Sequence, residues 1–422
     1  MTAVYLFGSF AFLLLISVPI GIALGVASLI ALLYSGALPV EYIVQNLVTS
    51  VDSFPIMAVP FFILAGEIMG KGGVTNRLFE VANTLVGNKT GGFAMATIIT
   101  CLFFAAISGS GPATVAAIGG IMIPAMVKMG YDKKFATALV AASGALGVII
   151  PPSIPMVIYG ITGGASVGDL FIAGIVPGIL VALGLMLYAY IYSRRKGYHG
   201  TGVPFTFSKL GKAVWEAKWA LIIPVIILGG IYGGVFTPTE AAAVAVVYGL
   251  IAGTLLYKEL KLKDLPKIIA DSALTTATVL IIIGTATVFG RIMTIEQIPG
   301  QVAGAMLSLS ENPIVIILII TAILLVIGCF MDTLAAIIIL TPLLLPIAVE
   351  LGYSPVHFGI IMIVNLAIGF ITPPLGVNLF VASGISGISI ESLSKAVLPF
   401  FAAMLFTLFI LIFIPQLTMF LL

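Results

Sequence analysis

Two stretches of the chain, GALGVIIPPS at 144–153 and LAIGFITPPL at 366–375, lie over each other when the sequence is shifted by 222 positions (366 minus 144). The same shift needs no gap and pairs further identical residues: Pro124 with Pro346, Gly130 with Gly352, Tyr131 with Tyr353, and Pro177 with Pro399. Apolar residues match easily by chance in an apolar chain, but Gly-Tyr and Pro-Pro pairs in one register do not. The sequence therefore predicts an internal repeat that spans about half the chain, and such a repeat constrains the whole fold.

The composition is that of a membrane protein. The 422 residues are 61% hydrophobic and only 8% charged, whereas soluble domains carry about 25% charged residues. Apolar runs of about 20 residues recur along the chain, and each is long enough to cross a bilayer as a helix. A β-barrel would show short alternating strands instead. We therefore expect an all-α, multi-pass membrane protein.

Charge and cysteine content exclude several other classes. The net charge of +2 is too small to indicate a nucleic-acid partner, and Cys101 and Cys329 both lie in apolar runs, which argues against a disulfide framework. No Lys or Arg precedes Lys71, so the charged region of a cleavable signal peptide is absent. We expect the first hydrophobic segment to remain in the protein.

The basic residues predict the orientation of the two halves. They fall into four clusters: Lys71, Arg77 and Lys89; Lys128, Lys133 and Lys134; Arg194–Lys196 through Lys218; and Lys258 through Lys267. The positive-inside rule places all four in the cytoplasm, so the helix pair 91–128 leaves from and returns to that side. The pair 313–350 is flanked by Glu296, Glu311 and Glu350, and no lysine lies between Arg291 and Lys395. This pair is expected to open to the outside, which makes the repeat inverted.

The predicted elements follow the repeat. The first half, 1–200, comprises scaffold helices in 1–70, a cytoplasmic arm helix 74–88, a hairpin 91–128, a broken helix 134–165 and a helix 170–193. The second half, 201–422, comprises scaffold helices in 215–257, a helix 271–291, an arm helix 297–310, a hairpin 313–350, a broken helix 355–386 and a helix 396–421. The segments 4–18 and 20–35, which meet at Pro19, could also form one tilted helix.

Each half contains a polar hairpin tip and a helix broken at Pro-Pro. The stretch AISGSGPAT at 106–114 interrupts a hydrophobic run, and the repeat places its Ser110 on Asp332. The tips are Ser108–Gly111 and Gly328–Thr333, and the breaks are Gly147–Ser153 and Gly369–Asn378. Lipid cannot satisfy the backbone groups that a break exposes. Inverted repeats with paired broken helices are typical of secondary transporters, which form their sites from such breaks near the membrane midplane.

The chemistry of these breaks suits an ion and an anion. Free carbonyl and hydroxyl oxygens favour a hard cation such as Na⁺, and free N–H groups favour an anionic group. A carboxylate as deep as Asp332 is costly unless it is paired, protonated or bound to a cation. Asp332 could also cap the helix that starts at Thr333, and the two roles are compatible. Ser108 and Ser110 could instead bond only their own helix backbone.

Other polar residues near the breaks have an ordinary structural alternative. Asn365, which overlies Ser143, and Asn378 could bind a ligand or bridge neighbouring helices. Ser153 and Thr372 could supply hydroxyl oxygens at the breaks. Glu240 follows Pro238 at a helix start, where the helix dipole explains an acidic residue.

Enzyme motifs are lacking. The chain has no G-x-x-x-x-G-K-[ST] loop for ATP and no H-E-x-x-H motif, and its only histidines are His199 and His357. A channel could also use broken helices. An inverted repeat with two unlike tips favours alternating access, as in a transporter.

Several stretches together resemble the large membrane subunit of the tripartite ATP-independent periplasmic (TRAP) transporters, over nearly the whole chain. They are PFFILAGEIM (60–69), AISGSGPATVAAIG (106–119), GVIIPPSIPMVIYG (147–160), FTPTEAAAVAVVYGLIAG (236–253), FMDTLAAIIILTPLLLPI (330–347) and GFITPPLGVNLFV (369–381). The resemblance implies a multi-pass protein of the bacterial inner membrane that takes up an organic acid. It implies coupling to two or more Na⁺ ions and an elevator mechanism, similar to the divalent-anion symporters. It also implies a soluble periplasmic binding protein and a small membrane (Q) subunit as a separate chain.

The resemblance also assigns the site residues. The first Na⁺ site would use Ser108, Gly109, Ser110 and Gly111 with the break that contains Gly147 and Pro151. The second would use Gly328, Asp332 and Thr333 with Gly369, Thr372 and Pro374, and the substrate would lie near Ser153, Thr372, Asn378 and Asn365. Overall likeness favours sialic acid over a C4-dicarboxylate as the substrate. A proton-coupled carrier is the nearest alternative, and a channel is a more distant one.

Overall fold

The computed structural model describes residues 1–36, 39–200, 205–310 and 312–422, and the regular structure within these ranges is helical throughout. Within them, nine helices are long and apolar enough to cross a bilayer, or ten if the bent pair Lys133–Ile149 and Ile154–Gly163 forms one span. The predicted all-α, multi-pass fold is therefore confirmed. Glu311 and the predicted start of the second half at 201 lie outside the described residues.

The helices follow one another with short connections. The first half contains α1 (Thr2–Leu15), α2 (Ile20–Ser35), α3 (Glu41–Thr49), α4 (Ala58–Lys71), α5 (Val74–Val86), α6 (Gly92–Ser108), α7 (Gly111–Lys128), α8 (Lys133–Gly144), α9 (Leu146–Ile149), α10 (Ile154–Gly163) and α11 (Val167–Lys196). The second contains α12 (Phe207–Tyr232), α13 (Pro238–Ile251), α14 (Leu265–Ile295), α15 (Ile298–Leu309), α16 (Pro313–Phe330), α17 (Thr333–Glu350), α18 (Pro355–Gly369), α19 (Val377–Ser386), α20 (Ile390–Phe413) and α21 (Gln416–Met419).

Corresponding helices of the two halves keep the 222-residue register. Both ends of α7 and α17 differ by that shift, and the loops that follow them contain Gly130 at φ +86° and Gly352 at φ +87°. At the next helix start, Asp132 accepts a hydrogen bond from the Phe135 N–H, and the equivalent Ser354 accepts one from the His357 N–H. The repeat therefore extends to local backbone geometry and capping.

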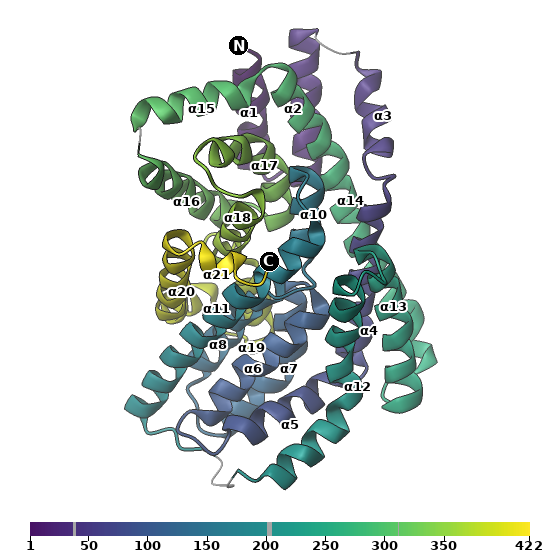
Figure 1. Cartoon of the computed structure of the whole chain (residues 1–422), viewed down its shortest axis with the longest axis vertical. Helices are drawn as coiled ribbons and strands as arrows, with labels where there is room; N and C mark the ends of the chain where they lie inside the picture. The colour runs from purple at the N-terminus through teal and green to yellow at the C-terminus, as the bar shows by residue number, and fades with distance from the viewer. Residues whose placement is uncertain (37–38, 201–204, 311) are drawn as a thin grey trace.

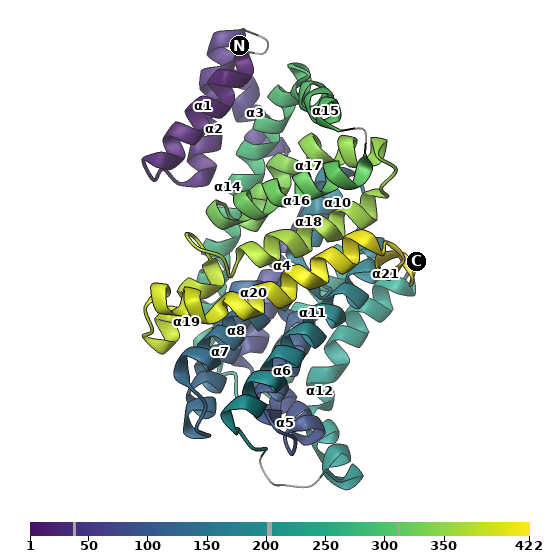
Figure 2. The ribbon, with the colours of Figure 1, turned by 90° about the vertical axis from the view of Figure 1, so that its left-hand side faces the viewer.

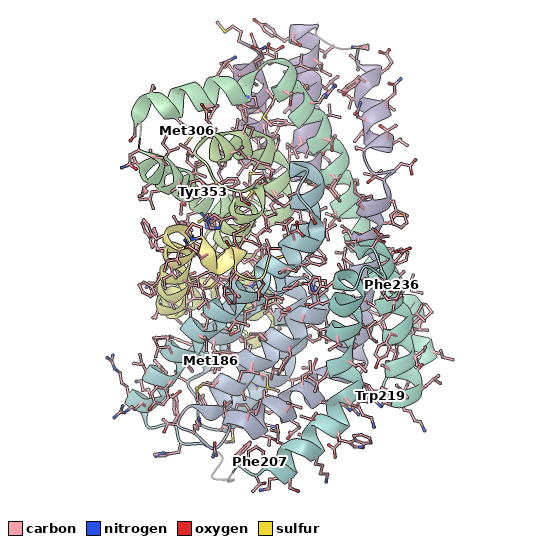
Figure 3. The ribbon with its side chains drawn as sticks, in the orientation of Figure 1. Met186, Phe207, Trp219, Phe236, Met306 and Tyr353 are labelled. Carbon is pink, nitrogen blue, oxygen red and sulfur yellow. The ribbon has the colours of Figure 1, made fainter. Side chains whose placement is uncertain are left out.

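The two arm helices lie at opposite ends of the molecule. In both views, α5 and the lysine-bearing start of α12 are at one end of the long axis, and α15 is at the other (Figures 1 and 2). Phe207 and Met306 mark these two ends (Figure 3). The hairpin of α6 and α7 lies toward the α5 end, whereas α16 and α17 lie toward the α15 end. This arrangement is what an inverted repeat requires; the sides of the membrane that the two ends face remain a prediction.

The segments that meet at Pro19 are two helices that pack side by side, as expected, and not one tilted helix: Pro19 occupies the N-cap position of α2, and Ser17 has a φ of +63° (Figure 2). Two details differ from the sequence-based expectations. The short helix α3 was missed, because its polar residues lower its hydropathy. The expected helix 396–421 is interrupted: α20 ends at Phe413, and Pro415 precedes α21.

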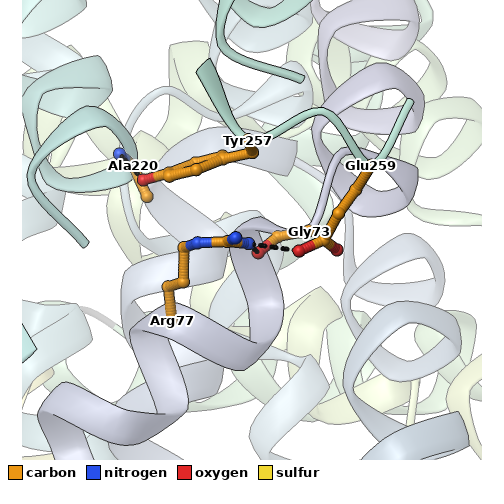
Figure 4. Close-up of polar contacts among 5 residues, drawn as sticks. All are labelled: Gly73, Arg77, Ala220, Tyr257 and Glu259. Carbon is orange, nitrogen blue, oxygen red and sulfur yellow. Dashed lines mark hydrogen bonds and ion pairs between the residues drawn. The ribbon is translucent and has the colours of Figure 1, made fainter. Parts of the chain in front are cut away.

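A polar cluster ties the first-half arm helix to the second half (Figure 4). The Arg77 guanidinium donates to the Gly73 carbonyl and the Glu259 carboxylate, both at 2.6 Å, and lies 3.9 Å from the centre of the Tyr257 ring. The Tyr257 hydroxyl accepts from the backbone N–H of Ala220, at 3.0 Å, in α12. Partly exposed contacts of this kind contribute about 0.5–1 kcal/mol each. They hold α5 against α12 and the segment after α13.

Glu240 has the structural role suggested by its position. Its carboxylate accepts from the Thr237 N–H at 2.8 Å, while the Thr237 hydroxyl accepts from the Glu240 N–H at 3.3 Å. This reciprocal pair is a capping box, and it fixes the start of α13.

Candidate functional site

Both hairpin tips and both broken helices border one cavity of about 700 Å³. The tips contribute Gly109, Ser110 and Pro112 from the first half and Asp332, Thr333 and Leu334 from the second; the breaks contribute Val148, Ile154, Pro155 and Phe370. The opposite wall consists of the start of α2 at 19–22, Ile63 from α4, and residues of α14 between 275 and 282. The cavity therefore lies between the repeated hairpin elements on one side and α2, α4 and α14 on the other; α2 and α4 belong to the predicted scaffold, and α14 extends that wall.

The first tip is a compact network of hydroxyl and carbonyl oxygens. The Ser108 and Thr114 hydroxyls are 2.9 Å apart, and the Thr114 hydroxyl donates to the Ser110 carbonyl at 2.8 Å. Ser110 caps α7, with its side chain accepting from the Ala113 N–H. Gly109 adopts a φ of +61°, a conformation that glycine reaches without strain. Several oxygen atoms consequently converge where the chain reverses.

The first broken helix is pressed directly against this tip. A methyl group placed on Gly147 would overlap the Ser110 carbonyl and approach the Thr114 hydroxyl. Beyond the break, the Ile154 N–H donates to the Gly109 carbonyl at 3.2 Å. Only glycine at 147 allows the two backbones to approach this closely.

The second tip has the same construction with a carboxylate in place of the serine. Asp332 caps α17, its Oδ2 accepting from the Leu334 N–H at 2.9 Å. A methyl group on Gly369 would overlap the Gly328 carbonyl in the last turn of α16, so this break also lies directly against its hairpin, although Gly147 contacts Ser110, the residue equivalent to Asp332. The Leu375 N–H donates to the Cys329 carbonyl at 2.9 Å. Asp332 thus has the capping role, which leaves its charge free for a further partner.

Asp332 is the one ionisable residue among the described residues that line the cavity. It forms no salt bridge in the described part of the chain, where the three ion pairs involve only Glu67, Lys71, Arg77, Glu259 and Asp271. An unpaired carboxylate in a membrane protein interior is costly, and a bound cation or a proton removes the cost. The Asp332 carboxylate and the neighbouring Thr333 hydroxyl are oxygen ligands of the kind that suit a hard cation.

Four residues expected to contact substrate do not line this cavity in the part of the chain that the structure describes. None of Ser153, Asn365, Asn378 and Thr372 lines the cavity. The Ser153 hydroxyl donates to the Val148 carbonyl at 2.6 Å, and the Thr372 hydroxyl donates to the Ile368 carbonyl at 2.8 Å.

The two asparagines join helices. The Asn365 amide donates to the Thr321 carbonyl at 3.0 Å, and that of Asn378 donates to the Ala141 carbonyl at 3.1 Å, which links the two halves. Both are fully buried. These contacts favour the helix-bridging alternative, and a direct contact with substrate stays a prediction.

Sequence reasoning missed the scaffold side of the cavity. Thr275 and Thr278 on α14 line it with the start of α2, but their hydroxyls lie in an ordinary helical stretch, and nothing in the sequence pairs them with the tips. Thr114 was also missed, although its spacing of four residues from Ser110 places both on one helix face.

Comparisons with known proteins agree with this architecture. The YdaH transporter of Alcanivorax borkumensis superimposes with a TM-score of 0.60 at 15% identity, over 88% of this chain and 87% of that one, which supports the fold alone. The C4-dicarboxylate TRAP transporter large permease protein DctM of Pseudomonas aeruginosa is 42% identical over 94% of this chain and 93% of its own length. The sialic acid TRAP transporter large permease protein SiaM of Vibrio cholerae is 38% identical over 96% and 95%.

The isethionate TRAP transporter permease protein DctMQ of Oleidesulfovibrio alaskensis is 56% identical over 98% of this chain, which spans only 65% of that relative's length. The model of the tripartite ATP-independent periplasmic transporter DctM component matches residues 7–417. With the cavity, the paired tips and the spanning helices, these matches show that the chain belongs to the DctM family and is a multi-pass transporter permease of the bacterial inner membrane, not an enzyme.

Proposed function

We propose that the chain carries out Na⁺-coupled uptake of a small organic acid, with the substrate delivered by a soluble periplasmic binding protein. The observation that carries this proposal is the shared cavity, where two oxygen-rich tips and two breaks meet beside one unpaired carboxylate. Among the described residues, none that lines the cavity is basic. An anionic substrate therefore needs cations that arrive with it, which gives a physical reason for coupling.

In this proposal, one Na⁺ binds at each tip. The first is held by Ser108–Gly111 and the carbonyls around Gly147–Pro151; the second is held by Gly328, Asp332 and Thr333 with the Gly369–Pro374 segment. Partial neutralisation of the tips then allows the free N–H groups beside the cavity to hold an acid group. The two hairpins and broken helices move together past α2 and α14 as an elevator.

The partners are also proposals. The relative named DctMQ is longer than this chain, and we propose that the small membrane subunit is a separate polypeptide here. Exposed apolar side chains on α3, such as Val44 and Val48 at 64% and 65% exposure, face lipid or that subunit.

The names of the relatives narrow the choice of substrate. They mention isethionate at 56% identity, C4-dicarboxylates at 42% and sialic acid at 38%. All three are oxyacids that are anionic at neutral pH. Isethionate is the first candidate to test, and sialic acid, which overall likeness of the sequence suggested, is the second.

The test is uptake into proteoliposomes that contain this chain, the small subunit and the binding protein. We expect an inward Na⁺ gradient to drive saturable accumulation of the acid, whereas a pH gradient without Na⁺ does not. Accumulation driven by the pH gradient alone would contradict Na⁺ coupling. Flux that does not saturate, and that needs no binding protein, would indicate a channel.

A further inference from the structure

A second cavity, of about 570 Å³, lies further along the same scaffold helix. The first cavity is lined by α14 residues between 275 and 282, and the second by residues between 283 and 294. Thirteen residues of helix separate Thr278 from Arg291, which corresponds to about 20 Å. The same two helices also contribute to both cavities. The first cavity is lined by the starts of α10 and α17, and the second by their later turns at 158–162 and 338–342. The second cavity therefore lies toward the α15 end of the molecule, which the charge pattern places outside.

The second cavity differs from the first in having a basic residue. Arg291 lines it and is exposed, and it forms no salt bridge or hydrogen bond within the part of the chain that the structure describes. A guanidinium inside a span of apolar helix is costly unless it faces a partner or a water-filled space. The cavity supplies the space, but the chain supplies no partner.

Other polar side chains line the same cavity as Arg291. Tyr42 and Asn46 on α3, and Ser50 directly after it, recur every four residues. The Asn46 amide donates to the Tyr42 carbonyl, and the Ser50 hydroxyl donates to the Asn46 carbonyl. Ser53, which follows them, also lines it, and its hydroxyl is buried without a hydrogen-bond partner among the described residues. The helix thus turns a polar face toward Arg291 and an apolar face outward. The Arg291 guanidinium and the Ser53 hydroxyl, neither of which has a partner among the described residues, are together suited to an oxyanion.

We propose that the second cavity is an anion-binding site in which Arg291 holds the carboxylate or sulfonate of the substrate on the periplasmic side. This inference rests on the proposed function. Arg291 belongs to α14 and not to the hairpins, so it stays in place when the tips move in the proposed elevator motion. A fixed positive charge then attracts the substrate on the periplasmic side. The substrate is released from the first cavity, where no described lining residue is basic.

The test uses the reactivity of a cysteine introduced beside Arg291. Thr294 is exposed and lines the cavity, so Thr294→Cys is treated, in the full transporter in nanodiscs, with methanethiosulfonate reagents carrying either an ethylsulfonate or an ethyltrimethylammonium group. An anion site makes the sulfonate reagent react faster than the cationic one. We expect Arg291→Gln to lower the sulfonate-to-cation rate ratio roughly tenfold, and Arg291→Lys to restore most of it.

Controls separate the possible causes. Protein without Thr294→Cys measures the background from Cys101 and Cys329, and Lys209→Gln removes an exposed positive charge at the opposite end. Isethionate should slow the sulfonate reagent in nanodiscs of neutral lipid. Protection by anionic lipid but not by isethionate would assign the site to a lipid headgroup and overturn the proposal, as would an unchanged rate ratio in Arg291→Gln.

The same preparation keeps the two proposals apart. If the wild-type protein shows no Na⁺-driven uptake, that result counts against the proposed function. The anion site can still be tested in that case, because the thiol assay needs no transport. A normal uptake rate with an unchanged rate ratio in Arg291→Gln counts only against the anion site.

Discussion

Asp332→Asn is expected to reduce Na⁺-driven uptake at least about a hundredfold while the protein stays folded, since the charge of the proposed cation ligand is lost but its shape is kept. The asparagine side chain still has an oxygen that can accept from the Leu334 N–H, so the cap of α17 persists. Asp332→Ala should also abolish uptake, and it loses the cap, at a cost of about 0.5–2 kcal/mol. Uptake in proteoliposomes and thermal unfolding in detergent measure the two effects separately.

The comparison between these two variants identifies the role of Asp332. If the residue is only a helix cap, Asp332→Asn transports like the wild type and Asp332→Ala is merely less stable. If the carboxylate binds Na⁺, both variants lose Na⁺-dependent uptake, and only Asp332→Ala unfolds at a lower temperature. Wild-type uptake by Asp332→Asn would therefore contradict the proposal that the Asp332 carboxylate binds Na⁺.

Gly147→Ala and Gly369→Ala are each expected to lower uptake by about two orders of magnitude or more. The added methyl groups would overlap the Ser110 and Gly328 carbonyls, which are backbone atoms that cannot rotate away. Relieving such an overlap costs about 1–3 kcal/mol, and here the tip must move away from the broken helix. Uptake at saturating Na⁺ and the Na⁺ concentration for half-maximal uptake measure the effect.

Matched controls lie on other helices of the hairpin and broken-helix segments. Gly120 on α7 and Gly384 on α19 are exposed, and a methyl group on either would contact nothing within 4 Å. Gly120→Ala and Gly384→Ala should transport normally and be no less stable, because alanine favours a helix by about 1 kcal/mol. Normal Na⁺ dependence in Gly147→Ala or Gly369→Ala would show that the close approach of tip and break is not needed.

The sequence predicted the features that depend on the internal repeat and on the positions of glycine and proline. Pro-Pro and Gly-Tyr in one register indicated the repeat, and the spacing of Ser110 and Asp332 indicated two equivalent tips. Glycine and proline restrict backbone geometry locally, so their positions can be interpreted without the fold. The helix boundaries were less predictable, because caps such as Ser166 and Ser389 decide them through single hydrogen bonds.

The walls of the cavities depend on packing and could not be predicted in this way. Thr278 and Arg291 line different cavities only because α14 passes both, and no local pattern encodes that path. For Asn378 the sequence left substrate binding and helix bridging both open, and the structure shows its amide donating to the Ala141 carbonyl, 237 residues away in sequence. A contact over such a separation is a property of the assembled halves.

The number of Na⁺ ions moved with each substrate molecule tests the central claim most directly. It can be measured in proteoliposomes of known membrane potential as the substrate gradient at which net flux stops. One cation at each tip means that at least two Na⁺ ions move with each substrate molecule. Once the contribution of the membrane potential is subtracted, a Na⁺ gradient of about tenfold should then balance a substrate gradient of about a hundredfold or more. A balance point that does not move with the Na⁺ gradient, or one that corresponds to a single ion, would contradict the two-tip account.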